Sequence, residues 1–155
     1  MKELEPTILF LDFDGVLHDS CEAVFDEYGR VQLDNPGLFE HVPLLADALA
    51  PHPSIRIIVS SNWQRLFSDA TLVRLLGPLG SRFVDVTEMR AGTRSEAILR
   101  SVQRRGLTAW LALDDDESVV EASRTDVRFI ACPSDAGISD IVALNTLKAR
   151  LAMLR

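Results

Sequence analysis

The sequence has few cysteines and no long apolar segment. Its two cysteines, Cys21 and Cys132, are far apart and form no CxxC or other metal-ligand spacing. We therefore expect buried or half-buried free thiols in a reducing compartment. No apolar run approaches the roughly 20 residues that span a bilayer. Residues 1–6 are acidic and lack the pattern of a secretory leader, so we expect a cytoplasmic protein.

Lysine is also scarce, and the charge balance is acidic. Acidic residues outnumber basic ones by 23 to 16, which gives a net charge of −7. This excess argues against broad electrostatic capture of nucleic acid or of an anionic membrane, although it leaves a local basic patch possible. The only lysines, Lys2 and Lys148, lie near the ends of the chain. A cation within a central site must therefore be an arginine.

Five apolar runs alternate with helical patterns along a chain whose 155 residues fit one domain, residues 1–155. This alternation predicts an α/β fold, a Rossmann-like three-layer sandwich with a central parallel sheet. The expected strands cover residues 8–11, 55–59, 83–86, 110–113 and 127–132. The expected helices cover residues 43–50, 63–76, 93–105 and 138–154.

The segment after the first strand departs from this alternation. Residues 23–25 and 31–33 flank a turn-like sequence and predict a small β-hairpin. Such a flap could cover a site at the end of the first strand, or it could be an ordinary surface hairpin. The sequence leaves both interpretations open.

Polar residues follow three of the expected strands at the point where each strand ends. Asp12 and Asp14 follow the first strand, Ser60 follows the second, and Asp114 with Asp115 follows the fourth. Because the carboxyl ends of parallel strands meet at one edge of a sheet, we expect these side chains to converge. The alternative for the first pair alone is a strand that ends in a solvated acidic turn.

A cluster of carboxylates at the rim of a core requires a cation to offset their repulsion. Ligand oxygens without histidine or cysteine favour a hard ion, and Mg²⁺ is the usual one. A carboxylate beside such an ion can attack a phosphorus centre. A second one can donate a proton to the leaving oxygen and later activate water. The pattern therefore indicates phosphoryl transfer.

Three segments together resemble the haloacid dehalogenase-like (HAD) phosphohydrolase superfamily. Residues 12–17, with the sequence DFDGVL, match its first motif. Residues 57–60 match its serine motif, and residues 111–115 match its paired-aspartate motif. The resemblance spans about residues 7–132 and implies the HAD-like core fold.

The resemblance also implies roles for the residues at the strand ends. Asp12 would be the nucleophile and Asp14 the general acid and base, while Ser60 would bind the phosphoryl group. Asp12, the backbone carbonyl of Asp14, and Asp115 would hold Mg²⁺, with Asp114 binding directly or through water. The implied activity is a Mg²⁺-dependent phosphatase that forms an aspartyl-phosphate.

The superfamily also requires a cation, usually lysine and sometimes arginine, facing the phosphoryl group. Arg94, at the start of an expected helix, is the best candidate, and Arg90 is the second. A cation in the first turn opposes the helix dipole, so a chemical role explains Arg94 better than a stabilising one.

The spacing of the motifs leaves no room for a large cap domain, so we expect an open site and a large or polymeric substrate. Residues 59–63 resemble small HAD domains of nucleic-acid repair proteins. The substrate could be a small molecule, a phosphoprotein or a nucleic-acid end. The main alternative is a non-catalytic regulatory module that binds a metal ion or phosphate. A dehalogenase and a receiver domain fit less well, the first because it does not need Asp14 and the second because its acids fall in another order.

Three residues near the motifs have open interpretations. His18 could contact substrate, but a lone histidine is more often a surface residue. Trp63 could stack on a base or pack beneath the edge of the sheet. Asp116 could assist the metal, but a solvated turn or a helix cap fits it better.

Overall fold

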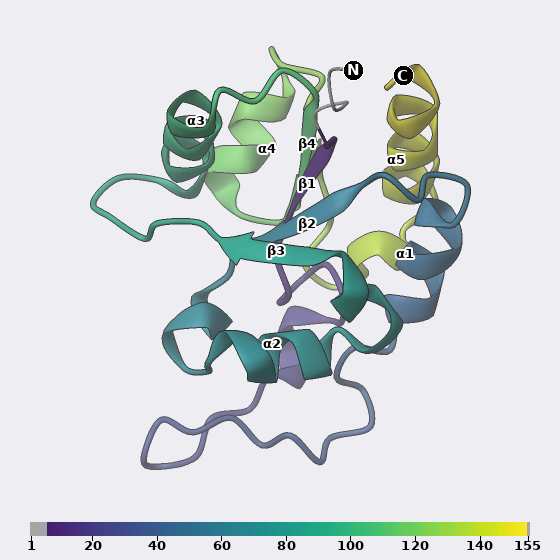
Figure 1. The fold of residues 1–155 in the computed structure, drawn as a ribbon. Coiled ribbons are helices and arrows are strands. Elements are labelled where there is room, and N and C mark those ends of the chain that lie inside the picture. The colour runs from purple at the N-terminus through teal and green to yellow at the C-terminus, as the bar shows by residue number, and fades with distance from the viewer. Residues whose placement is uncertain (1–5, 155) are drawn as a thin grey trace.

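A computed structural model describes residues 6–154 of the chain (Figure 1). Its five strands form one parallel sheet in the order β3-β2-β1-β4-β5. The strands are β1 (Ile8–Leu11), β2 (Arg56–Val59), β3 (Phe83–Val86), β4 (Trp110–Asp114) and β5 (Phe129–Ala131). All five expected strands are confirmed, and the N-terminal residues 1–5, including Lys2, lie outside the described residues.

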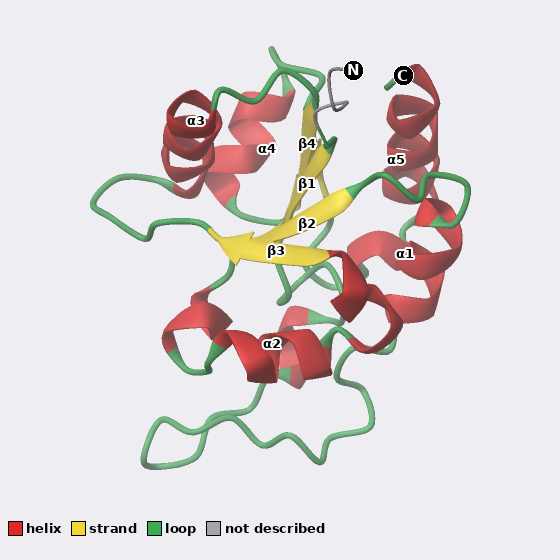
Figure 2. Ribbon diagram, viewed as in Figure 1, coloured by secondary structure: helices red, strands yellow, loops and turns green. Residues whose placement is uncertain are grey.

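Helices cover both faces of this sheet, as the three-layer prediction requires (Figure 2). The α-helices are α1 (Val42–Leu49), α2 (Asp69–Leu75), α3 (Arg94–Arg105), α4 (Glu117–Ser123) and α5 (Ile141–Met153). Short 3-10 helices lie at Ser20–Glu22, Asn62–Arg65, Gly77–Arg82 and Gly137–Ser139. Within the described residues, no helix is both long and apolar enough to cross a membrane.

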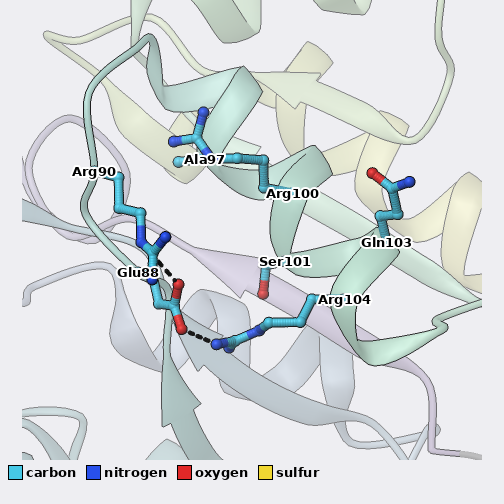
Figure 3. Close-up of a pocket in the computed structure, with 7 residues that line it drawn as sticks. All are labelled: Glu88, Arg90, Ala97, Arg100, Ser101, Gln103 and Arg104. Atoms are coloured by element: carbon cyan, nitrogen blue, oxygen red, sulfur yellow. Dashed lines mark ion pairs between the residues drawn. The ribbon is translucent and has the colours of Figure 1, made fainter.

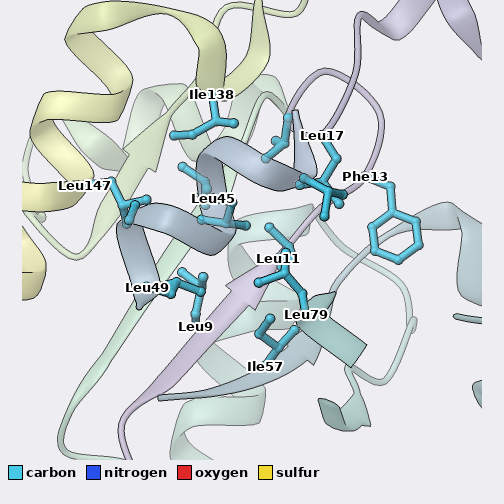
Figure 4. Packing of buried hydrophobic residues seen from close by; sticks show 14 of the residues in the cluster. Leu9, Leu11, Phe13, Leu17, Leu45, Leu49, Ile57, Leu79, Ile138 and Leu147 are labelled. Carbon is cyan, nitrogen blue, oxygen red and sulfur yellow. The ribbon is translucent and has the colours of Figure 1, made fainter. Parts of the chain in front are cut away.

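The alternation of side chains along β1 divides the core into two clusters, because successive residues of a strand point to opposite faces. Leu9 and Leu11 pack against α1, α2 and α5 in the larger cluster (Figure 4). Ile8 and Phe10 pack against α3 and α4 in the smaller one. β1 is central and buried on both faces, so its carboxyl end lies deep in the molecule.

Two expected helices are interrupted, and one helix was not expected. Residues 63–76 form a 3-10 turn and then α2, because Ser61 caps the first and Ser68 caps the second. Residues 138–154 divide in the same way at Asp140, which caps α5. α4 has only seven residues, too few to show a helical period in the sequence.

The segment between β1 and α1 is a long loop rather than a folded cap (Figure 1). The predicted hairpin is reduced to one antiparallel bridge between Phe25 and Val31. Asp26 holds its turn by accepting hydrogen bonds from the backbone N–H groups of Tyr28 and Arg30, both at 2.9 Å. Within residues 12–41, the only helix is the 3-10 turn at Ser20–Glu22.

Candidate active site

The ends of β1 and β4 bring three carboxylates together. Leu11 of β1 is in register with Leu113 of β4, so Asp12 and Asp114 follow side by side. One carboxylate oxygen from each of Asp12, Asp114 and Asp115 lies within 4.8 Å of the others. Asp12 and Asp114 are buried, and Asp115 is half-buried. The predicted convergence therefore occurs although Asp12 and Asp114 are far apart in the chain.

The position of Asp115 depends on Gly15 and Ser134. Gly15 has a φ of +72°, in the left-handed region that favours glycine. A Cβ atom at Gly15 would lie only 2.0 Å from Oδ2 of Asp115, so the backbone approaches this carboxylate as closely as glycine allows. The Ser134 hydroxyl donates to the same Oδ2 at 2.8 Å. Neither contact follows from a local sequence pattern.

Arg94 extends from the first turn of α3 into the carboxylate cluster. Its Nη1 lies 3.0 Å from Oδ2 of Asp114 and 3.4 Å from Oδ1 of Asp12. The same nitrogen donates to the backbone carbonyl of Ser60 at 2.6 Å. The second candidate, Arg90, is 74% exposed and pairs with Glu88. The structure therefore brings Arg94, and not Arg90, to the carboxylates.

The electrostatics of the cluster leave it short of positive charge. Burial raises the pKa of Asp12 well above its ordinary value of 3.8, and the adjacent Asp114 carboxylate raises it further. Burial also raises the pKa of Asp114, against the lowering effect of Arg94. Burial lowers the pKa of Arg94, but Asp114 and Asp12 outweigh this effect and the pKa is raised overall. One guanidinium does not compensate for the buried carboxylates, so the site favours a further cation.

The donor set fits a hard divalent ion. Oxygen ligands about 2.1 Å from Mg²⁺ are at most about 4 Å from one another, so small movements of the three carboxylates would suffice. Both cysteines are free, and Cys132, which follows β5 and donates its backbone N–H to the Asp114 carbonyl, is buried. Burial and the nearby Asp114 carboxylate raise the pKa of the Cys132 thiol, which disfavours a thiolate ligand.

Ser60 lies at the end of β2, beside this cluster. Its side chain is buried, and its Oγ accepts a hydrogen bond from the Thr87 hydroxyl at 3.2 Å. This arrangement leaves the Ser60 proton available to a phosphoryl oxygen. Thr87 directly follows β3 and is not among the site residues predicted from the sequence. Its only signal in the sequence was a hydroxyl side chain placed, like Ser60, at the end of an expected strand.

Asp14 lies on the loop after β1, where two aromatic residues contact it. His18 Nε2 is 2.7 Å from Asp14 Oδ1, and Trp63 Nε1 donates to the same oxygen at 2.9 Å. His18 is fully buried, so the expectation of a surface histidine is wrong. Trp63 is also buried and is not available for stacking on a base, whereas the packing interpretation is confirmed. Asp116 caps α4, as one of its three interpretations proposed.

The comparisons with known proteins agree with this architecture. Residues 8–143 match the family model described as the HAD domain in Swiss Army Knife RNA repair proteins. No curated protein is similar enough to count as a relative. The match extends from β1 into α5 and includes every strand of the sheet and each candidate site residue. The chain therefore belongs to the family of HAD domains found in Swiss Army Knife RNA repair proteins.

Proposed function

We propose that this HAD-family hydrolase is a Mg²⁺-dependent phosphatase that cleaves a phosphate monoester through an aspartyl-phosphate on Asp12. One observation carries the proposal: buried Asp12 and Asp114 share a site with Arg94 at the carboxyl edge of the sheet. A site of this kind is costly to the fold unless it binds ligands. The cytoplasmic location stays a prediction from the sequence.

The reaction would use two carboxylates in sequence. The Asp12 carboxylate attacks phosphorus, and the bond from phosphorus to the leaving oxygen breaks as Asp14 donates its proton to that oxygen. Asp14 then removes a proton from water, which attacks the same phosphorus atom. The bond between phosphorus and the Asp12 oxygen breaks, and phosphate leaves. This restores the Asp12 carboxylate and the proton of Asp14.

The remaining residues would stabilise charge in this sequence. Ser60 would donate its hydroxyl proton to a phosphoryl oxygen, and Arg94 would face the equatorial oxygens. Asp12, Asp114 and Asp115, with the backbone carbonyl of Asp14, would hold Mg²⁺. When bound, Mg²⁺ would reduce the repulsion between Asp12 and the incoming phosphate.

The surroundings of the site favour a phosphorylated nucleic-acid end as the substrate. A pocket of about 520 Å³ beside Arg94 is also lined by Arg65 and Arg90. A second pocket of about 350 Å³ shares Arg90 and continues along α3 past Arg100 and Arg104 (Figure 3). In this second pocket Glu88 pairs with Arg90 and Arg104. Across the two pockets five arginines face three acidic residues, Glu88, Asp116 and Glu117, and this local excess of positive charge on an acidic chain suits the phosphates of a strand that extends from the site.

Turnover of an aryl phosphate with Mg²⁺ tests the reaction. We expect Asp12→Asn to abolish turnover and to prevent trapping by beryllium fluoride with Mg²⁺. The control is Asp126→Asn, which changes a carboxylate paired with Arg128 at the opposite edge of the sheet. Full activity of Asp12→Asn would refute the mechanism. Binding of Mg²⁺ by the unmodified chain without turnover of any phosphate would favour the non-catalytic module.

A panel of phosphorylated oligonucleotides and mononucleotides tests the substrate. We expect saturation by an oligonucleotide, with a KM that Arg65→Gln and Arg100→Gln raise while mononucleotide hydrolysis is unchanged. Each lost phosphate contact should reduce the slope of log affinity against log salt by about 0.7. Arg124→Gln, which removes an exposed arginine paired with Glu121, is the control. Equal KM values for oligonucleotide and mononucleotide would contradict a strand-binding surface.

A further inference from the structure

Two hydrogen-bond donors converge on a single oxygen of Asp14. His18 Nε2 lies 2.7 Å from Oδ1, and Trp63 Nε1 lies 2.9 Å from the same atom. Within residues 6–154, no donor contacts the other oxygen, Oδ2. The Asp14 side chain is 32% exposed, whereas the His18 side chain is fully buried. The carboxylate thus has one oxygen held by the protein and one without a protein partner.

A backbone N–H group fixes which ring nitrogen of His18 carries the proton. The Phe39 N–H donates to Nδ1 of His18 at 3.2 Å, so Nδ1 carries no proton. The ring proton therefore resides on Nε2 and points to Asp14 Oδ1. With both ring nitrogens engaged and no solvent exposure, His18 acts as a fixed donor.

An aromatic cluster holds the two donors in place. The ring of Phe39 packs edge-on against Trp63, His18 and Phe13, with centroid distances of 5.2, 5.0 and 5.4 Å. Phe39 has a φ of 59°, in the left-handed region that is strained for a non-glycine residue. Strain of this kind is found where the surroundings require a particular geometry. Here the strained residue supplies the N–H that orients His18.

We propose that His18 and Trp63 are positioning residues that turn Asp14 so that Oδ2 transfers the proton to the leaving oxygen. Oδ1 already accepts two hydrogen bonds from fixed donors, so the transferable proton must be on Oδ2. The inference rests on the proposed phosphatase function, since it assigns the two oxygens of its general acid. The two aspartates also differ in their surroundings, which agrees with their separate roles. The Asp14 carboxylate accepts hydrogen bonds from two neutral side-chain donors, whereas the Asp12 carboxylate faces the charged Arg94.

The kinetic test uses Trp63→Phe, which removes the indole N–H and keeps an aromatic ring in the cluster. General acid catalysis matters most for a poor leaving group, so an alkyl phosphate and p-nitrophenyl phosphate should respond differently. We expect kcat/KM for the alkyl phosphate, which reports the step that expels the leaving group, to fall about 10- to 100-fold, within the range of general acid catalysis. We expect kcat/KM for p-nitrophenyl phosphate to change by less than about 3-fold, because its leaving group needs little proton assistance. Hydrolysis of the aspartyl-phosphate, in which Asp14 is the base, is common to both esters and does not enter kcat/KM.

His18 provides a second variant with a conservative rescue. His18→Leu should reproduce the selective loss on the alkyl phosphate, and His18→Gln, which retains an amide donor, should recover part of it. Trp110→Phe is the matched control: Trp110 is equally buried, and its Nε1 has no hydrogen-bond partner within the described residues. We expect this control to alter stability without altering the ratio of the two kcat/KM values.

A spectroscopic measurement tests the contact without turnover. The chain has two tryptophans, so its nitrogen–proton spectrum contains two indole signals, which Trp110→Phe assigns. Asp14→Ala should shift the Trp63 signal upfield and leave the Trp110 signal in place. Equal losses of kcat/KM on both esters, or a Trp63 signal that Asp14→Ala leaves unchanged, would overturn the positioning role. If the unmodified protein hydrolyses neither ester, the phosphatase proposal fails, and the indole signals still decide whether the donors hold Asp14.

Discussion

Replacing Gly15 by alanine tests whether the backbone of the first motif positions Asp115 for a metal ion. A Cβ at this position would lie 2.0 Å from Oδ2 and 2.4 Å from Cγ of Asp115. Contacts shorter than 3.0 Å do not persist, so the carboxylate has to retreat by at least about 1 Å. Such a movement would also disturb the hydrogen bond from Ser134.

Two separate costs can be worked out for Gly15→Ala. The first is backbone strain at a φ of +72°, about 1–2 kcal/mol of unfolding free energy. The second is loss of metal affinity, because ligand distances in a metal site tolerate only about 0.2 Å of error. We expect Mg²⁺ to bind at least about 10-fold more weakly, which corresponds to about 1.4 kcal/mol.

Gly29→Ala separates these two costs. Gly29 has a nearly equal φ of +75°, and a Cβ there would meet nothing within 4 Å. This variant should show the strain without the loss of Mg²⁺ affinity. Chemical denaturation measures the first quantity and calorimetric titration with Mg²⁺ measures the second. Equal Mg²⁺ affinity in the two variants would refute the placement of Asp115 in the metal site.

Three further predictions concern the charges of the site and the scaffold. Because Asp12 and Asp114 have raised pKa values, the native metal-free protein retains protons that the unfolded chain releases above pH 3.8. Their contribution to unfolding free energy therefore falls as the pH rises through the raised values. Asp12→Asn should therefore reduce the loss of unfolding free energy with rising pH, measured by denaturation in EDTA. An unchanged pH dependence would contradict a raised pKa of Asp12. Arg94→Ala should lower kcat about 100- to 1000-fold, yet bind Mg²⁺ no more weakly, since it removes a competing cation. Weaker Mg²⁺ binding on titration would argue that Arg94 orders the carboxylates instead. Arg82 donates to three backbone carbonyls in residues 49–55, so Arg82→Met should cost about 1–3 kcal/mol of unfolding free energy without changing Mg²⁺ affinity. A measured change in that affinity would contradict a purely structural role.

Local patterns were sufficient for the sheet and for most of the helices. β1 is a continuous apolar run buried on both faces, and the alternation of such runs with helical segments is specific to a parallel sheet. The helices were less well predicted where serine side chains accept hydrogen bonds from backbone N–H groups and so begin a new helix. Ser61 and Ser68 each cap a separate short helix in a stretch that reads as one continuous pattern.

The sequence by itself determined that Asp12, Asp114 and Asp115 meet, because parallel strands place their carboxyl ends at one edge whatever the length of chain between them. It did not separate Asp14 from this cluster, although the Asp14 carboxylate lies against His18 and Trp63. It also narrowed the cation to an arginine, since lysine is nearly absent. The sequence also ranked Arg94 above Arg90, but only the tertiary structure decided the choice, because it depends on where the first turn of α3 lies relative to β1 and β4. The contacts to Asp14 were likewise settled by folding. Trp63 is 49 positions from Asp14 in the sequence, and its hydrogen bond to Asp14 depends on tertiary packing that no local sequence pattern predicts.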